Sequence, residues 1–210
     1  MQKPNVLFIS SWYPSREHPT LGNFVQRHAE AINSFVNLYV VFVVSSPSIH
    51  KGFEICNSIE NGVNTTIVYY QKVTSKIPVL SSLVKLKRYK IGYQKGINFI
   101  ESKFNISAFD ICHCNVTFPA GLIALELKKK RNIPFVLTEH WTLFLPNKNE
   151  YKKLPFYVRN KMKNILREAK KVVPVSTFLA ESMINLGLIK DYEIIPNVVD
   201  TAVFYHKEQM

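Results

Sequence analysis

Residues 109–141 read FDICHCNVTFPAGLIALELKKKRNIPFVLTEHW, and this stretch decides the predicted fold. A strand-like run over 109–114 is followed by a segment of helical character over 119–130, and then by an apolar run over 134–138. Short, mostly apolar runs are typical of strands buried on both faces. A strand–helix–strand order implies a right-handed crossover between parallel strands, so the stretch predicts one βαβ unit.

The same alternation continues on both sides of that unit. Upstream, strands are predicted over 6–11 and 38–44, with an amphipathic helix from Phe24 between them. The downstream elements expected are helices over 154–170 and 177–186 and strands over 172–175 and 193–195. This order predicts an α/β fold: a doubly wound, mostly parallel, Rossmann-like sheet with helices on both faces.

Local turn chemistry adds detail to this plan. Asn61-Gly62 is a strong tight-turn pair and predicts a hairpin between strands over 53–59 and 63–70. Residues 76–103 form a long, basic, mostly helical region, with Pro78 in its first turn. Ser176 and Gly187 suit the start and the stop of the helix over 177–186.

Composition bounds the class of protein. The chain has 210 residues, 47% of them hydrophobic, which suffices for one large core. Its formal net charge of +12 favours an anionic partner, although a solvated basic surface explains the charge equally well. An odd number of cysteines, three, does not suggest a disulfide framework. No stretch reaches the roughly 20 apolar residues of a membrane span. No signal peptide precedes the first strand, so we expect a cytoplasmic protein.

Function should collect at the carboxyl ends of the predicted strands, because open parallel sheets bind ligands there. The loop after the first strand carries Trp12, Arg16 and His18, and Gly22-Asn23 opens the next helix. A glycine turn at a helix N-terminus can meet an anion, but a plain turn with a helix cap is an equal alternative. The loop lacks a G-x-G-x-x-G fingerprint and a P-loop lysine, which argues against a nucleotide redox cofactor.

Glu139 and His140 follow the strand over 134–138. A histidine in that position is well placed for contact with a substrate. Adjacent residues of a strand point to opposite faces, so we expect Glu139 to be solvated rather than to orient His140. Ser176 also ends a strand, but the chain lacks the G-x-S-x-G elbow of a hydrolase.

Cys112 and Cys114 share one face of their strand, and His113 lies on the other. A zinc site needs about four convergent ligands with characteristic spacing, and the sequence offers no second pair. We therefore expect buried, inert cysteines and no metal site.

Four blocks, in this order, resemble the N-terminal half of retaining glycosyltransferases of family 4, which have the two-domain GT-B architecture. They are WYPSREHPTLGNFVQRHAEAI, FDICHCNVTFPAGLIALELKKKRNIPFVLTEHW, AKKVVPVSTFLAESMINLG and YEIIPNVVDTAVF. Three positions depart from the family pattern. Gly22 stands alone where many members carry a glycine pair, Asn115 replaces the second histidine of a His-x-His, and Val198 replaces the glycine of Pro-Asn-Gly-Val-Asp.

The resemblance implies transfer of a sugar from a nucleoside-diphosphate sugar, with the anomeric configuration retained and without a metal or other cofactor. It assigns Gly22 and Asn23 to the donor phosphates and His140 to the transferring sugar. On position, Trp12, Arg16, His18 and Asn115 are acceptor-side candidates. The acceptor implied is a glycan or a lipid-linked molecule, in surface polysaccharide or glycoconjugate synthesis.

The resemblance also implies a division of labour. In the family, a second domain holds most of the donor nucleotide, and the Ile-Pro-Asn segment leads into it. We therefore expect 1–200 to be an acceptor-side N-terminal domain and 201–210 to begin an interdomain linker. With the donor-binding domain absent, residues 1–210 should show little or no transferase activity.

One alternative class is a non-catalytic basic module for an anionic partner, either nucleic acid or an acidic membrane. No nucleic-acid-binding motif supports the first partner. Residues 76–95 mix leucines with Lys85, Lys87 and Arg88. We interpret them as a core helix with a basic solvent face, and peripheral membrane contact is the alternative.

Overall fold

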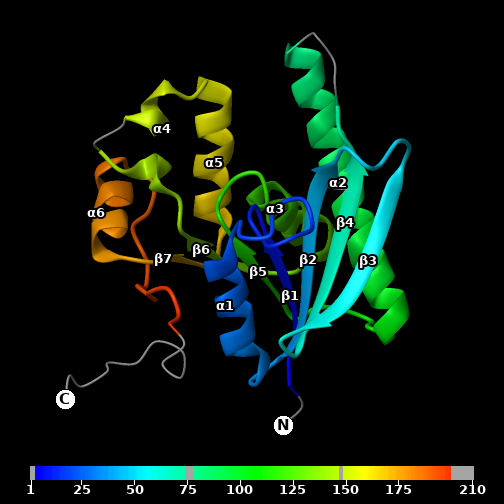
Figure 1. The fold of residues 1–210 in the computed structure, drawn as a ribbon. Coiled ribbons are helices and arrows are strands. Elements are labelled where there is room, and N and C mark those ends of the chain that lie inside the picture. Colours follow the sequence, from blue (N-terminus) through cyan, green and yellow to red (C-terminus); the bar gives the residue numbers. More distant parts are fainter. Residues whose placement is uncertain (1–2, 74–77, 147–148, 200–210) are drawn as a thin grey trace, which may run out of the picture.

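The computed structural model describes residues 3–73, 78–146 and 149–199 (Figure 1). The strands are β1 (Asn5–Ser10), β2 (Asn37–Ser46), β3 (Phe53–Glu60), β4 (Val63–Gln71), β5 (Ile111–Asn115), β6 (Phe135–Glu139) and β7 (Lys171–Pro174). The helices are α1 (Asn23–Asn33), α2 (Pro78–Phe104), α3 (Gly121–Arg131), α4 (Glu150–Lys153), α5 (Phe156–Glu168) and α6 (Thr177–Asn185), with a 3-10 turn η1 at Thr142–Phe144.

The strands form one seven-stranded sheet in the order β3-β4-β2-β1-β5-β6-β7. Every pairing is parallel except that of β3 with β4, so the predicted α/β, mostly parallel sheet is confirmed. The chain starts in the middle at β1 and winds outward through β2 to β4. It then returns along α2 and places β5 on the other side of β1. The strand order therefore reverses between β1 and β5, where such sheets bind ligands.

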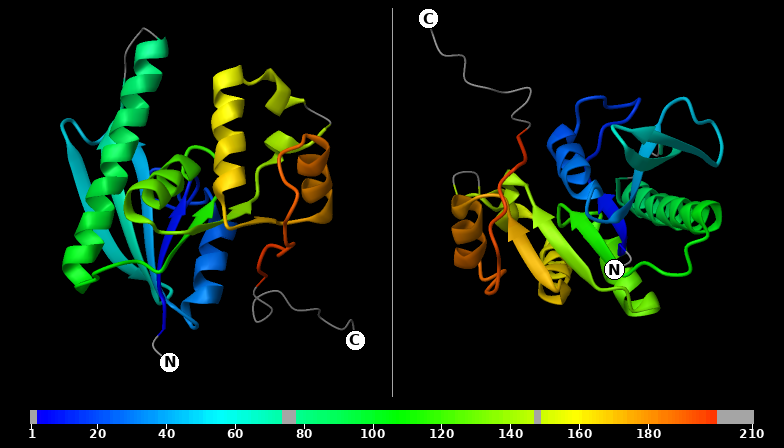
Figure 2. Two further views of the ribbon diagram at one scale, coloured as in Figure 1. Left: turned by 180° about the vertical axis from the view of Figure 1, so that it is seen from behind. Right: turned by 90° about the horizontal axis from the view of Figure 1, so that it is seen from below.

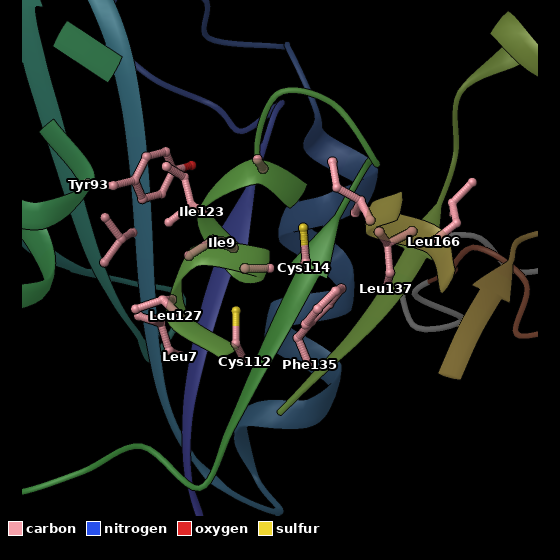
Figure 3. Close-up of a cluster of buried hydrophobic side chains, with 14 of the residues drawn as sticks. Leu7, Ile9, Tyr93, Cys112, Cys114, Ile123, Leu127, Phe135, Leu137 and Leu166 are labelled. Carbon is pink, nitrogen blue, oxygen red and sulfur yellow. The ribbon is translucent and has the colours of Figure 1, made fainter. Parts of the chain in front are cut away.

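Helices cover both faces of the sheet (Figure 2). On one face, Leu7 and Ile9 of β1 belong to a buried cluster that includes side chains of α2, α3 and α5. Cys112 and Cys114 lie in the same cluster, as Figure 3 shows. On the other face, Phe8 packs in a second cluster with Val25 and other residues of α1. The alternation along one strand thus supplies two cores, and the prediction of buried cysteines is confirmed.

Two glycines on one face of α2 let this helix lie close to the sheet. A Cβ atom on Gly92 would stand 2.5 Å from Cγ1 of Val43, and one on Gly96 would stand 2.8 Å from Cγ1 of Val41. Both separations are below van der Waals contact, so a side chain at either position would force the helix or the valine beneath it to shift.

Most of the predicted local signals are confirmed. Asn61 and Gly62 take positive φ values of 49° and 81° in the turn of the β3–β4 hairpin. Ser176 caps α6 by accepting a hydrogen bond from the backbone N–H of Leu179 at 3.2 Å. Gly187 follows the end of α6 with a φ of 66°.

Two predictions need correction. The helix expected over 154–170 begins only at Phe156, after Pro155, and α4 and η1 precede it without having been predicted. The strand expected over 193–195 is wrong: in the described part of this segment, a single bridge joins Tyr192 to Val172. Pro196 explains the loss, because it lacks an N–H and restricts the residue before it. Residues 76–77 and 201–210, which the predictions also covered, lie outside the described residues.

Candidate functional site

The register of the sheet brings three strand ends together at the point where the strand order reverses. Asn115 of β5 pairs with Ser10 of β1 on one side and with Thr138 of β6 on the other. Asn115 is completely buried. The loop after β1 and the loop after β6 therefore meet beside this one asparagine.

His140 lies directly after β6 and contacts side chains from three other parts of the chain. Its Nε2 atom is 3.3 Å from Oδ1 of Asn115, and its Nδ1 atom is 3.0 Å from Oδ1 of Asn197. The ring centroids of Phe24 and His28, both on α1, stand 4.9 Å and 5.2 Å from that of the His140 ring. Burial, and next the neighbouring His28, lower the pKa of His140 to about 3. His140 is therefore neutral near pH 7 and acts through hydrogen bonds.

Gly22 forms the turn that leads from the first loop into α1. Its φ is 71°, in the left-handed region. A Cβ atom at this position would stand 2.6 Å from the carbonyl carbon of Trp12, so the turn accepts only glycine without distortion. Asn23, the next residue, is exposed and begins α1.

Aromatic side chains in contact with one another connect this turn to His140. The Trp12 ring meets Trp141 edge-on at 5.8 Å and Phe24 at 6.2 Å, centroid to centroid. Phe24 in turn contacts His140. The structure thus brings Trp12, Gly22, Asn115 and His140 into one neighbourhood.

Arg16 and His18 lie elsewhere. The Arg16 guanidinium makes a bidentate ion pair with Glu54 of β3, at 2.6 and 2.8 Å, and stacks 3.8 Å from the centroid of the Tyr69 ring on β4. Since β4 is four strand spacings from β6, these contacts lie roughly 19 Å from the strand that carries His140. His18 is exposed in a backbone turn with Ser15. The structure does not bring either residue to His140.

Glu139 is fully buried, and the expectation that it is solvated is wrong. One carboxylate oxygen accepts hydrogen bonds from the backbone N–H and the hydroxyl of Thr117, and the other accepts from the backbone N–H groups of His140 and Trp141, at 2.9 and 2.8 Å. Burial raises the pKa of this carboxyl, and the hydrogen bonds oppose that rise.

The reason for the error is physical. Glu139 does point away from His140, but the opposite face of a doubly wound sheet is also covered. There the carboxylate ties the loop after β5 to the loop after β6, and so it holds the backbone at His140.

Sequence reasoning missed four further side chains around His140: Phe24, His28, Trp141 and Asn197. One signal could have found two of them. Phe24 and His28 are four residues apart and therefore share a helix face. Asn197 belongs to the Ile-Pro-Asn block, whose position beside β6 the sequence does not reveal.

His113 belongs to the neighbourhood but makes a contact of its own. Its Nε2 atom lies 2.8 Å from Oγ1 of Thr138, and burial lowers its pKa to about 4. Among the described residues, no three His, Cys, Asp or Glu side chains are arranged to hold a metal ion. In the same part of the chain, no helix has the length and apolar character that crossing a bilayer requires.

Comparison with known proteins identifies the family. The family model described as Glycosyltransferase Family 4 matches residues 57–203. A curated relative, an uncharacterized glycosyltransferase of Methanocaldococcus jannaschii, is 26% identical over 144 residues. The match covers 66% of this chain and 38% of that protein, so the chain spans well under half of the relative's length.

Solved structures share the fold at low sequence identity. An E. coli trehalose-6-phosphate protein bound with UDP-2-fluoro glucose aligns at 11% identity with a TM-score of 0.55, over 94% of this chain and 50% of that one. The N-terminal domain of Candida albicans trehalose-6-phosphate phosphatase aligns at 11% identity with a TM-score of 0.58, over 95% of this chain and 50% of that one. A Medicago truncatula protein complexed with UDP-glucose aligns at 11% identity with a TM-score of 0.53, over 95% of this chain and 53% of that one. The fold is thus that of one half of a GT-B protein.

Proposed function

Because the chain belongs to glycosyltransferase family 4, we propose that residues 1–200 are the N-terminal domain of a retaining glycosyltransferase and that 201–210 begin its interdomain linker. The enzyme transfers a sugar, of hexosyl type, from a nucleoside-diphosphate sugar to an acceptor. The observation that carries the proposal is the half-buried contact of His140 with Asn115 at the reversal point of the sheet. Two structures with this fold are complexes with a UDP-sugar, which supports a nucleotide sugar as donor.

His140 contacts the transferring sugar in this proposal. A neutral imidazole can accept a hydrogen bond from a sugar hydroxyl or donate one to it. The buried surroundings strengthen such a bond, and Glu139 fixes the backbone from which it is made. His140 thereby orients the sugar without adding positive charge near the reacting carbon.

Gly22 and Asn23 approach the donor phosphates. The helix α1 begins directly after the turn at Gly22, where Oδ1 of Asn23 accepts a hydrogen bond from the N–H of Phe24 at 2.8 Å. The first turn of a helix favours negative charge. We expect this contribution to replace a metal ion in part, with the remaining positive charge supplied by the second domain.

Trp12, Arg16, His18 and Asn115 remain the acceptor-side candidates. Trp12 and Asn115 lie beside His140 and suit a sugar acceptor, since an aromatic face and an amide are typical sugar contacts. Arg16 and His18 line the outer loop and would meet only an acceptor that extends across the sheet edge.

A groove apart from the His140 neighbourhood, between α2 and α5, suits an apolar part of the acceptor. It measures about 550 Å³ and lies between the first turns of α2 and α5, which rise beyond the strands in Figure 1. Its apolar lining includes Leu83, Leu86, Tyr89, Phe118, Tyr157 and Val158. Lys85 and Lys161 stand at its margin. These features support a lipid-linked acceptor at the cytoplasmic face of a membrane, in surface polysaccharide or glycoconjugate synthesis, with peripheral contact through 76–95.

Binding of the donor tests the central proposal. Residues 1–210, labelled with 15N, are titrated with UDP-glucose, GDP-mannose and the matching free nucleotides. We expect weak binding, with shifts at Gly22 and at His140, and larger shifts at His140 with the sugar present. No shift with any nucleotide sugar, or equal shifts with and without the sugar, would contradict it.

The same preparation tests the division of labour. We expect no turnover of nucleotide sugar onto acceptor by residues 1–210, and measurable transfer would overturn this part. Duplex DNA at low salt serves as the control for a basic binding module. Tight, salt-sensitive binding to it would favour that alternative.

Sedimentation with phosphatidylglycerol vesicles tests the membrane contact. Lys85→Glu with Lys87→Glu should abolish binding, since both side chains are exposed on α2. Lys129→Glu with Lys163→Glu, an equal change of charge elsewhere, should have little effect. Unchanged binding after the first pair of substitutions would contradict an electrostatic contact between α2 and the membrane.

A further inference from the structure

Asn197 connects the segment after α6 to two histidines from other elements. Its Oδ1 atom lies 3.0 Å from Nδ1 of His140 and 3.3 Å from Nε2 of His28. His28 is buried on α1, and His140 follows β6. One amide thus joins α1, the end of β6 and the segment over 193–199.

The two hydrogen bonds of His140 constrain which of its ring nitrogens carries a proton. Both of its ring nitrogens face amide oxygens, Oδ1 of Asn197 and Oδ1 of Asn115. Satisfying two acceptors would require a doubly protonated, cationic ring. Burial opposes this charge, as does the adjacent His28, and the ring is neutral near pH 7. One of the two amides must therefore present its NH₂ group to His140.

The surroundings of Asn115 decide which amide turns. With its oxygen toward His140, the Nδ2 group of Asn115 is buried and has no hydrogen-bond partner. A buried N–H without a partner is among the most costly defects in a protein interior. Rotating this amide by 180° exchanges nitrogen and oxygen, so that Nδ2 donates to Nε2 of His140. The buried donor then has a partner, and Nε2 needs no proton.

Asn197 fits the complementary role. Its oxygen has two lone pairs and can accept from Nδ1–H of His140 and from Nε2–H of His28 together. Each histidine then carries a single proton, in a tautomer fixed by the same oxygen.

We propose that Asn197 is a positioning residue that, together with His28, fixes His140 in the Nδ1–H tautomer and presents its Nε2 lone pair to Asn115 and to a substrate hydroxyl. This inference rests on the proposed function only where it names a substrate hydroxyl as a partner of Nε2. The tautomer and its dependence on Asn197 are properties of residues 1–210 alone. In the resting state the Nδ2 group of Asn115 occupies the lone pair. A sugar hydroxyl that takes its place donates to Nε2 of His140 and accepts from Nδ2 of Asn115, so the buried donor keeps a partner.

Long-range 1H–15N correlation spectra of histidine-labelled chain at pH 7.5 test the proposal directly. The wild type should show His140 mainly as the Nδ1–H tautomer and His28 as the Nε2–H tautomer. Asn197→Ala should shift His140 toward the Nε2–H form that free imidazole side chains prefer. Asn197→Asp keeps an acceptor oxygen and should restore the Nδ1–H form.

Asn185→Ala serves as the matched control, because Asn185 is an exposed asparagine of α6 outside these contacts. It should leave both tautomers unchanged. An Nε2–H tautomer of His140 in the wild type would overturn the proposal, as would a tautomer that Asn197→Ala does not change. A merely structural role would lower the melting temperature of Asn197→Ala without changing the tautomer. If nucleotide sugars fail to bind while the tautomer follows Asn197, the proposed function fails and this inference stands.

Discussion

Two regions at the carboxyl edge of the sheet use polar side chains in opposite ways. The inner cluster, formed by Asn115, Glu139, His140 and Asn197, is built on hydrogen bonds that run from the buried Glu139 and Asn115 to the exposed Asn197. The outer pair, Arg16 and Glu54, is a bidentate ion pair in solvent. Charge is partly suppressed in the inner cluster, where burial raises the carboxyl pKa and lowers the imidazole pKa, and is fully expressed in the outer pair. The comparison shows that solvent exposure decides which polar groups at this edge of the sheet carry their charge.

Removing the Glu139 carboxylate should produce the largest effect. Glu139→Ala leaves four donors on two loops without their acceptor, and we expect a loss of about 3–5 kcal/mol in the free energy of unfolding. Urea denaturation measures this loss. Glu181→Ala, on the exposed side of α6, should cost less than about 0.5 kcal/mol. A loss below about 1 kcal/mol for Glu139→Ala would show that the carboxylate does not hold the two loops.

Gly22→Ala should rank second, and Gly52→Ala is its matched control. Both glycines have positive φ, 71° and 77°, but a Cβ atom meets the Trp12 backbone at Gly22 and nothing within 4 Å at Gly52. Gly52→Ala should therefore cost about 1 kcal/mol, the penalty of the left-handed conformation alone. Gly22→Ala should cost about 2–4 kcal/mol, since backbone must also shift. Equal losses in thermal unfolding would mean that the contact with Trp12 relaxes freely.

Acid should destabilise the chain through the buried histidines. His113 and His140 have pKa values lowered to about 4 and about 3, against roughly 6.5 when unfolded. The unfolded chain therefore binds protons below pH 6.5 that the folded chain does not, and the free energy of unfolding falls from pH 6.5 toward pH 4. The raised pKa of Glu139 has the opposite effect on the free energy of unfolding as the pH falls. The test therefore compares the slope of the wild type with the slopes of histidine variants.

His140→Gln should reduce the slope of stability against pH in this range, and His18→Gln, at an exposed position, should not. Denaturation midpoints at pH 7.0, 6.0, 5.0 and 4.5 give the slopes. A wild-type slope retained in His140→Gln would contradict the lowered pKa of His140.

The outer pair should give the smallest change in stability. The guanidinium of Arg16 holds the pKa of Glu54 down at about 2. Arg16→Gln should return that pKa to the ordinary range of an exposed glutamate, as carboxyl NMR titration would show. The urea midpoint should hardly change, because solvent screens exposed ion pairs. A large shift of the midpoint would mean that the outer loop contributes to the core.

The fold could be predicted because its signals are local and repeated. Apolar runs such as 6–11 and 134–138 are strands whichever partner they find, and Asn61-Gly62 forms its turn without help from the rest of the chain. The position of His140 followed from the rule that strand ends gather at one edge. The segment over 193–195 failed because a single proline, Pro196, outweighed an apolar run.

The site could be predicted only in part, because its contacts depend on the third dimension. That Glu139 is buried required knowing that both faces of the sheet are covered. The partnership of His140 with Asn197 joins residues 57 positions apart, and no spacing indicates it. Arg16 carried the right chemistry at the right strand end, yet it lies far from His140 and pairs with Glu54 of the edge strand β3.

The overhang of α2 has an evolutionary consequence. This helix has 27 residues and a length of about 40 Å, whereas β2, on which Gly92 and Gly96 lie, has 10 residues and reaches about 33 Å. Its later turns, with Gly92 and Gly96, are seated on the sheet and tolerate little change. Its earlier turns carry Leu83 and Leu86, which line the groove. Mutation can therefore change the lining of the groove while the fold is conserved. On the proposed function, related chains could acquire new acceptors in this way without rebuilding the core.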